Sequence, residues 1–238
     1  AAILDGVSGH ACRVFDLAAE GATIRNLTMA GGSIVDNITM VFGADLRIQS
    51  AGGTVSNCVL TAGYIGKGPS NSKLFNGSCG AAAAVLGGLL THCVVTGNVA
   101  NVASNDGGAG AGIIRQVGGR VEYCLVANNT VNDSYMEGDK FSSVLRVTGG
   151  SLANCTVVSN DVSRGWTVSA ISGTTSFGRI ANCLIACNRS ANPDVAYAAV
   201  CNNDGTAGSM SHCAGDRETG KEGIVFAEDF KFVDPANG

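Results

Sequence analysis

The chain has 238 residues, enough for one large domain with a substantial core. Its 15 Lys and Arg against 19 Asp and Glu give a net charge of −4, which offers no electrostatic footprint for nucleic acid or an anionic membrane. The most apolar stretch, 81–90, is far shorter than the roughly 20 residues of a membrane span. We therefore expect no nucleic-acid partner and no membrane insertion by this segment, and, without a visible signal peptide, a mature chain or a cut fragment.

A repeat of about 31 residues runs along most of the chain. Each copy has Gly, an apolar residue, a polar residue, Cys and further apolar residues, as in GGTVSNCVLTAG from Gly52 and GGRVEYCLVANN from Gly118. An earlier copy, from Gly21, has Leu where the others have Cys. The anchor positions, separated by 31, 35, 31, 31, 28 and 30 residues, are Leu27, Cys58, Cys93, Cys124, Cys155, Cys183 and Cys213.

Five further columns keep register with the anchor at position 0. Apolar residues at −3 and +2 are expected to face inward, which requires a turn near −1 because strands alternate with a period of two. Position −1 holds residues that tolerate left-handed backbone: Asn26, Asn57, His92, Tyr123, Asn154, Asn182 and His212. Position −5 suits bends that need positive φ or close approach: Gly53, Gly88, Gly119, Gly150, Gly178 and Gly208. Position +5 is a polar column of Asn98, Asn129, Asn160 and Asn188.

These columns predict an all-β solenoid in which each turn of the chain lies on the one before. The segments are rich in Val, Ile, Thr and Gly, and they lack the i, i+3, i+4, i+7 spacing of helical repeats. Seven anchors imply roughly seven coils with side loops, formed by inserts at 63–80, 99–110, 131–141 and 161–167.

The repeat resembles that of the right-handed parallel β-helix proteins of bacteria, in the pectate-lyase-like superfamily, and is similar to the G-G-x-I-x-N-C-x-I-x-x-N units of secreted and autotransporter-type surface proteins. The opening Ile3-Leu4-Asp5-Gly6 resembles their first coil, and the segment 230–238 resembles their C-terminal segment. The resemblance implies a single right-handed parallel β-helix domain over 1–238. It also implies that the chain is a module of a larger protein that is secreted or displayed on the bacterial cell surface.

The cysteine column is expected to be a ladder of buried, unpaired thiols with a structural role. Equivalent residues of stacked coils have parallel Cβ vectors, which is poor disulfide geometry, and free Cys is among the most buried residue types. Off the column, Cys187 and Cys201 are the best candidate pair, and whether they pair is left open. No CxxC occurs, and we expect no metal bound by these cysteines.

The inserts hold the candidate ligand contacts, because recognition usually sits in loops on a rigid scaffold. Trp166, Tyr135 and Lys140 are the candidates for glycan contact. Nearby carboxylates carry enough oxygen atoms for Ca²⁺ but match no EF-hand loop, and we favour the reading without metal or other cofactor: Asp133, Glu137 and Asp139.

The candidates for catalysis are two pairs at equal offsets from their cysteines. Arg115 and Arg146 each lie nine residues before a Cys and should stack in adjacent coils, and Asp106 and Glu137 each lie thirteen after one. Enzymes of the resembled superfamily act on polysaccharides along such coils. A lyase needs a base beside a cation, and a hydrolase needs two carboxylates at a set separation, neither of which the sequence displays.

We therefore predict a structural, adhesive or self-assembling extracellular module without catalysis. The alternative is a polysaccharide lyase or hydrolase, or a carbohydrate-binding β-helix. The expected partners are further copies stacked end to end or flanking coils of the same protein, with glycans as a further option.

Overall fold

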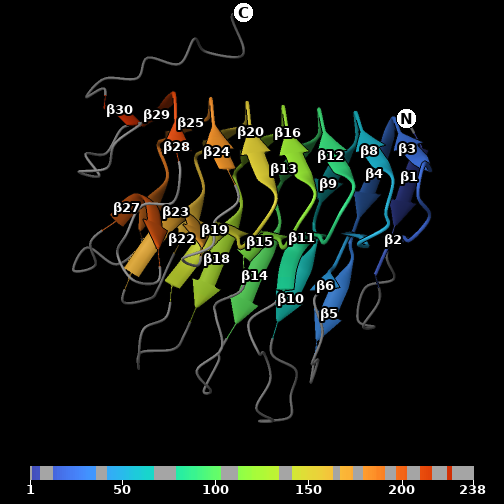
Figure 1. Cartoon of the computed structure of the whole chain (residues 1–238). Coiled ribbons are helices and arrows are strands. Elements are labelled where there is room, and N and C mark those ends of the chain that lie inside the picture. The colour runs from blue at the N-terminus through green and yellow to red at the C-terminus, as the bar shows by residue number, and fades with distance from the viewer. Residues whose placement is uncertain are drawn as a thin grey trace, which may run out of the picture.

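The structure is a computed structural model that describes residues 2–5, 13–35, 42–66, 79–102, 112–133, 141–162, 167–173, 179–190, 197–202, 210–215 and 224–226. Within this part of the chain every element is a β-strand and every strand pairing is parallel. The strands stack in chain order along a rod (Figure 1), which confirms the all-β parallel solenoid. No helix of the described residues is long and apolar enough to cross a membrane.

The strands form four parallel sheets, here named sheets A to D. Sheet A contains β1 (Ala2–Asp5), β4 (Leu27–Ala30), β9 (Val59–Thr61), β13 (Val94–Thr96), β17 (Leu125–Ala127), β21 (Thr156–Val158), β25 (Leu184–Ala186), β29 (Cys213–Gly215) and β30 (Ile224–Phe226). Sheet B contains β5 (Ser33–Val35), β10 (Tyr64–Gly66), β14 (Val99–Val102), β18 (Thr130–Asp133), β22 (Asp161–Val162) and β26 (Arg189–Ser190).

Sheets C and D complete each coil. Sheet C contains β2 (Phe15–Leu17), β6 (Phe42–Gly43), β7 (Leu46–Ile48), β11 (Cys79–Val85), β15 (Gly112–Gln116), β19 (Phe141–Val147), β23 (Thr167–Gly173) and β27 (Tyr197–Asn202). Sheet D contains β3 (Thr23–Arg25), β8 (Thr54–Ser56), β12 (Leu89–Thr91), β16 (Arg120–Glu122), β20 (Ser151–Ala153), β24 (Arg179–Ala181) and β28 (Met210–Ser211).

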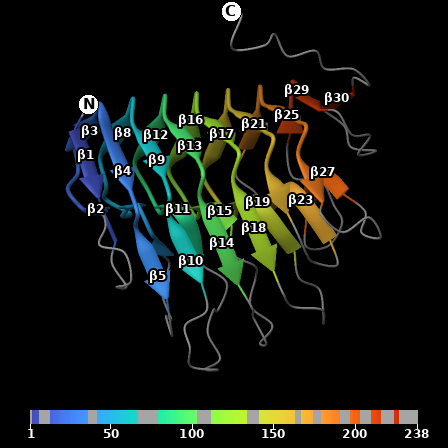
Figure 2. The ribbon, with the colours of Figure 1, turned by 180° about the vertical axis from the view of Figure 1, so that it is seen from behind.

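One coil visits the sheets in the order C, D, A, B, as in β11, β12, β13 and β14, and then returns to sheet C at β15. Figure 2 shows the coils from the opposite side, where the strands of sheet A and those of sheet B form two rows along the rod. The number of strands differs among the sheets, from six described in sheet B to nine in sheet A. The coil count therefore differs slightly from seven, since β1 and β30 extend sheet A beyond the recognisable copies of the repeat.

The corner between sheets D and A lies at the predicted position. All seven residues at position −1 have φ between 51° and 59°. A second left-handed corner, between sheets A and B, lies at position +4, where φ is positive at Gly31, Ala62, Gly97, Asn128, Ser159 and Cys187. The corner at −1 interrupts the alternation, so position −3 before it and positions 0 and +2 after it all face the core.

The core is formed by the predicted apolar columns. Residues at −3 and +2, such as Val121 and Val126, are fully buried, and the same holds in neighbouring coils. Gly88, Gly119 and Gly150 of column −5 have positive φ. Gly53 instead allows close approach, because a Cβ there would overlap Ala22 O. Gly178 lies outside the described residues.

The predicted inserts need one correction. Their first residues form strands of sheet B rather than loops, as β10, β14, β18 and β22 show. These strands are short and mostly carry a single buried residue, such as Ile65 or Ala100, so their sequences lack a visible alternation.

Candidate functional site

The two arginines predicted to stack lie side by side on sheet C. Arg115 of β15 pairs in register with Arg146 of β19, which confirms their neighbourhood. Arg146 lies between Leu145 and Val147, both in the core, so alternation places its side chain on the outer face of the sheet. Even so, Arg115 is only 8% exposed and Arg146 only 1%.

The guanidinium group of Arg146 is buried beside a group of like charge. Burial, followed by the like charge of Arg115, lowers the pKa of Arg146 to about 10. Among the described residues, Nε and Nη1 of Arg146 have no hydrogen-bond partner. Among the described residues, no carboxylate forms an ion pair with Arg146. Elsewhere on sheet C, Asp16 of β2 forms an ion pair with Arg47 of β7 and accepts a hydrogen bond from Gln49 Nε2 at 2.9 Å.

The other candidates from the sequence fall where nothing can be said of their side chains. Asp133 ends β18, and only its backbone is described. The remaining candidates lie outside the described residues: Asp106, Glu137, Trp166, Tyr135, Lys140 and Asp139. Within the described ranges, no group of three or more His, Cys, Asp or Glu residues is arranged to hold a metal ion.

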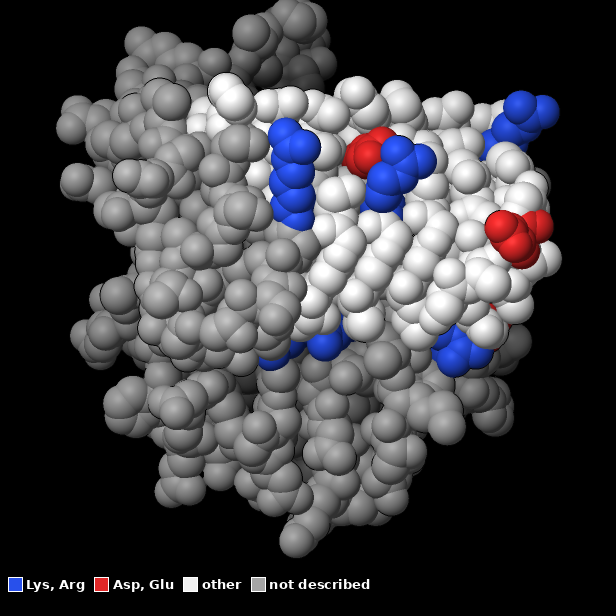
Figure 3. Space-filling view, viewed as in Figure 1, with Lys and Arg blue, Asp and Glu red and all other residues white. Residues whose placement is uncertain are grey.

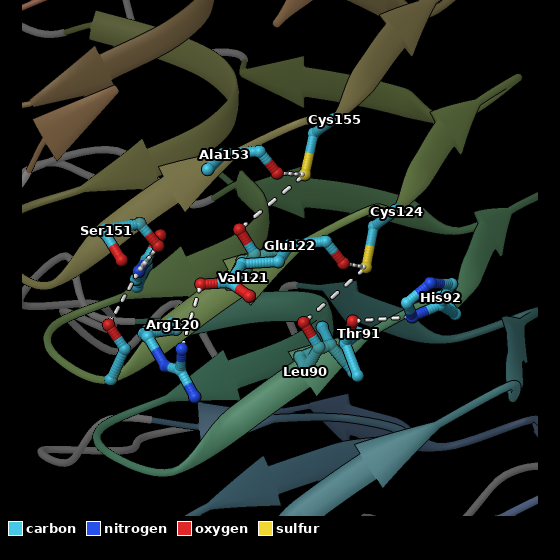
Figure 4. Close-up of polar contacts among 12 residues, drawn as sticks. Leu90, Thr91, His92, Arg120, Val121, Glu122, Cys124, Ser151, Ala153 and Cys155 are labelled. Carbon is cyan, nitrogen blue, oxygen red and sulfur yellow. Dashed lines mark hydrogen bonds and ion pairs between the residues drawn. The ribbon is translucent and has the colours of Figure 1, made fainter. Parts of the chain in front are cut away.

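The thiol ladder lies inside the corner between sheets D and A. Cys58, Cys93, Cys124, Cys155 and Cys183 are buried free thiols, and Cys213 is buried as well. Figure 4 shows Cys124 Sγ directed at two carbonyl oxygens, Glu122 O at 3.3 Å in its own coil and Leu90 O at 3.7 Å in the preceding coil. Cys155 repeats the pattern. Hydrogen bonding with neighbouring thiols, together with burial, raises the pKa of Cys124, so this group is held as a thiol.

Cys187 and Cys201 lie on different sides of the coil. Cys187 is exposed at the corner between sheets A and B, and Cys201 belongs to β27 of sheet C. The side chain of Cys201 is not among those described, so their pairing stays open.

Column +5 is a second ladder, built from asparagine side chains inside the corner between sheets A and B. Asn129 Oδ1 accepts from the backbone N–H of Asn98 at 3.0 Å and from Asn98 Nδ2 at 2.9 Å. Asn129 in turn donates to Asn160 Oδ1 from both nitrogens, and Nδ2 also donates to Val95 O at 2.9 Å. Asn188 continues the chain of bonds. The ladder holds consecutive coils in register along the rod axis.

The first two rungs of this ladder are glycines, and a buried carboxyl replaces the missing amide. The backbone N–H of Gly32 donates to Asp45 Oδ1 at 3.0 Å. In the later rungs, the asparagine at the same position of the next coil accepts this bond. That next position is Gly63, and a Cβ there would lie 2.6 Å from Asp45 Oδ2 and would overlap Ala81 O. Asp45 is fully buried, and burial raises its pKa to about 8, although the Gly32 bond acts in the opposite direction.

The outer surfaces of sheets D and A differ in charge. Sheet D carries Arg25, Arg120, Glu122 and Arg179 among its described outward residues, and Arg120 pairs with Glu122 at 3.3 Å. On the described part of the face seen in Figure 3, charged side chains are few. Asp5 of β1 lies in register with Ala30 of β4. From β4 to β29, the described outward residues of sheet A carry no charge. They form a column at +1 (Thr28, Val59, Val94, Leu125, Thr156, Leu184 and Ala214) and a column at +3 (Ala30, Thr61, Thr96, Ala127, Val158 and Ala186).

Polar residues flank these two columns. The −1 residues are mostly exposed, and the rings of His92 and Tyr123 stack with their centroids 4.9 Å apart. Tyr123 is 53% exposed and Leu125 is 37% exposed. We call the +1 and +3 columns together the apolar strip.

Comparison with known proteins adds no family. No protein-family model, no curated protein and no solved structure matches the chain. The parallel β-solenoid therefore stands on the structure itself.

Proposed function

We propose that the chain is a non-catalytic structural module of an extracellular, bacterial-type parallel β-helix protein, and that its coils associate with further coils end to end. The resemblance of its repeat to surface and secreted β-helix proteins supports the location. The two internal ladders support a structural role, because the buried thiols and most of the buried amides bond to their own scaffold.

The observation that carries the proposal is the edge of three sheets at one end of the rod. Within the described residues, sheets B, C and D end on β5, β2 and β3, which lie together at the blue end of Figure 1. Ala22 O accepts from Thr54 N, and Asn26 N donates to Ser56 O, so alternate residues bond to the next coil. The intervening Thr23 and Arg25 therefore aim their backbone groups at the open edge. An edge strand of this kind is a template for another strand.

End-to-end association can be tested by light scattering and electron microscopy over increasing protein concentration. Rods that lengthen with concentration support the proposal. Thr23→Pro removes a backbone donor from the open edge and should shorten the rods, whereas the matched Thr23→Ser keeps the donor and should not. Rods of one fixed length at every concentration would rule out end-to-end growth.

The polysaccharide alternative rests on a different observation, the stacked Arg115 and Arg146 on the outer face of sheet C. Guanidinium groups bind carboxylates well, so an acidic glycan is the substrate class to test. A glycan panel with product analysis separates the classes. Unsaturated sugars or new reducing ends demand an enzyme, and binding without products indicates a carbohydrate-binding module.

A further inference from the structure

We infer that the apolar strip of sheet A is a docking surface for the same strip of a second copy, so that two rods pack side by side. The inference builds on the proposed self-association but places it on a different surface from the rod end. The composition of the strip favours an identical partner. Seven consecutive strands, from β4 to β29, present only Thr, Val, Leu and Ala outward. Nothing on this surface would repel an identical surface or leave a charge buried without a partner.

The shape of the strip also favours a second copy as its partner. The +1 column carries the larger residue in several coils, including Leu125 and Leu184, while the +3 column has Ala127 and Ala186, which are buried. In these coils the strip therefore has a raised residue beside a recessed one, whereas Thr156 and Val158 are of similar size. A flat partner of unrelated sequence would match neither this relief nor the repeat along the rod, but a second copy has both.

Two-fold symmetry allows the strips of two copies to fit together. A two-fold axis parallel to the rods, lying between the two faces, exchanges the columns across the interface. Leu125 then lies opposite the partner's Ala127, and Val94 opposite the partner's Thr96. Every coil contributes such a pair twice, as an isologous interface requires. A two-fold axis along the strands would instead set Leu125 against the partner's Leu125 and leave the recessed columns facing each other.

The strip and its flanking columns are large enough for a specific dimer interface. Strands lie about 4.8 Å apart and residues about 3.3 Å apart, so seven strands from column −1 to column +4 cover roughly 550 Å². A dimer would bury about 1,100 Å² in total, which passes the ~1,000 Å² that a specific interface needs. Tyr123 at the edge of the strip supplies an exposed aromatic of the kind enriched at interfaces.

The test is sedimentation velocity of the whole chain over a concentration series, together with small-angle scattering. Leu125→Lys places a charge in the centre of the strip and should raise the dimer Kd at least 100-fold. The matched control is Leu89→Lys, which adds the same charge at an outward position of sheet D and should leave the Kd unchanged. Thermal unfolding of both variants checks that each remains folded.

A second variant keeps the inference falsifiable if Leu125→Lys fails to fold. Tyr123→Asn installs the residue that Asn57 and Asn154 already have at the same corner, so folding is retained, and it should weaken the dimer about tenfold. In scattering, a lateral dimer has a thicker cross-section and the length of one rod.

The outcomes separate this inference from end-to-end growth. Association that lengthens the rods and is unchanged in Leu125→Lys and Tyr123→Asn would overturn the inference and leave the proposed function standing. Lateral dimers that never lengthen would support the inference and overturn the end-to-end growth of the proposed function. A chain that is monomeric at every concentration would overturn both.

Discussion

Replacing Asp45 by Asn should stabilise the protein at neutral pH and remove a pH dependence. Asp45 lies where two oxygens, Ala81 O and Asn98 Oδ1, converge on the space beside Gly63. A charged carboxylate is unfavourable among acceptors, and no described charged group offsets it. An amide keeps the carbonyl oxygen for the Gly32 N–H and turns a donor toward these acceptors.

The magnitude follows from proton linkage. The folded pKa of Asp45 is raised from 3.8 to about 8, so the unfolded chain releases this proton at lower pH than the folded chain. The free energy of unfolding should therefore fall as pH rises from about 4 to about 8, by up to ~1.4 kcal/mol per pH unit, and the fall should stop above that range. At pH 7 the cost of keeping the carboxyl protonated is about 4 kcal/mol, which is the upper limit of what Asp45→Asn can recover.

Urea unfolding at pH 5, 7 and 8.5 measures this directly. The difference in stability between Asp45→Asn and wild type should grow with pH across this range. Asp45→Ala is the control, because it removes the charge but also leaves the buried Gly32 N–H without its acceptor, and it should gain less stability. Parallel pH profiles for wild type and Asp45→Asn would refute the reasoning.

Three further predictions concern the ladders and the arginine pair. Cys124→Ser should lower the free energy of unfolding by roughly 1–3 kcal/mol, because it places a hydroxyl in the thiol stack. The thiols of the column should react with a thiol reagent far more slowly in the native protein than in urea. Fast labelling of the native protein would contradict their burial. Asn129→Ala should cost about 3 kcal/mol in urea unfolding, because it strands buried donors of the adjacent rung, whereas Asn128→Gly at the exposed corner should cost little. Acidic polysaccharides should yield no cleavage products, and product formation that disappears in Arg115→Ala or Arg146→Ala would overturn this.

Much of the fold could be predicted because the repeat places each residue type where its physical property is needed. Asn57 and His92 tolerate left-handed backbone, and their column marks a corner of every coil. The second corner could not be found in this way, because Ala62, Ser159 and Cys187 carry no preference for positive φ. There the neighbouring coils fix the conformation.

The candidate site was harder to predict. Arg115 and Arg146 are neighbours as their spacing requires, but spacing alone does not reveal that both are buried. Asp45 lies outside the repeated segment, so nothing in the sequence links it to Gly32 or Gly63. The residues of the apolar strip alternate along each strand with core residues that are also apolar. The corners decide which of these columns faces solvent, so the sequence alone does not reveal the strip.

Small-angle X-ray scattering of the unmodified chain over a wide concentration range tests the central claim, self-association of a rigid rod, most directly. The particle mass should rise with concentration, with growth along the rod from the open sheet edges and a thicker cross-section from paired strips of sheet A. Scattering from a single rod of constant mass, length and cross-section at every concentration would contradict it.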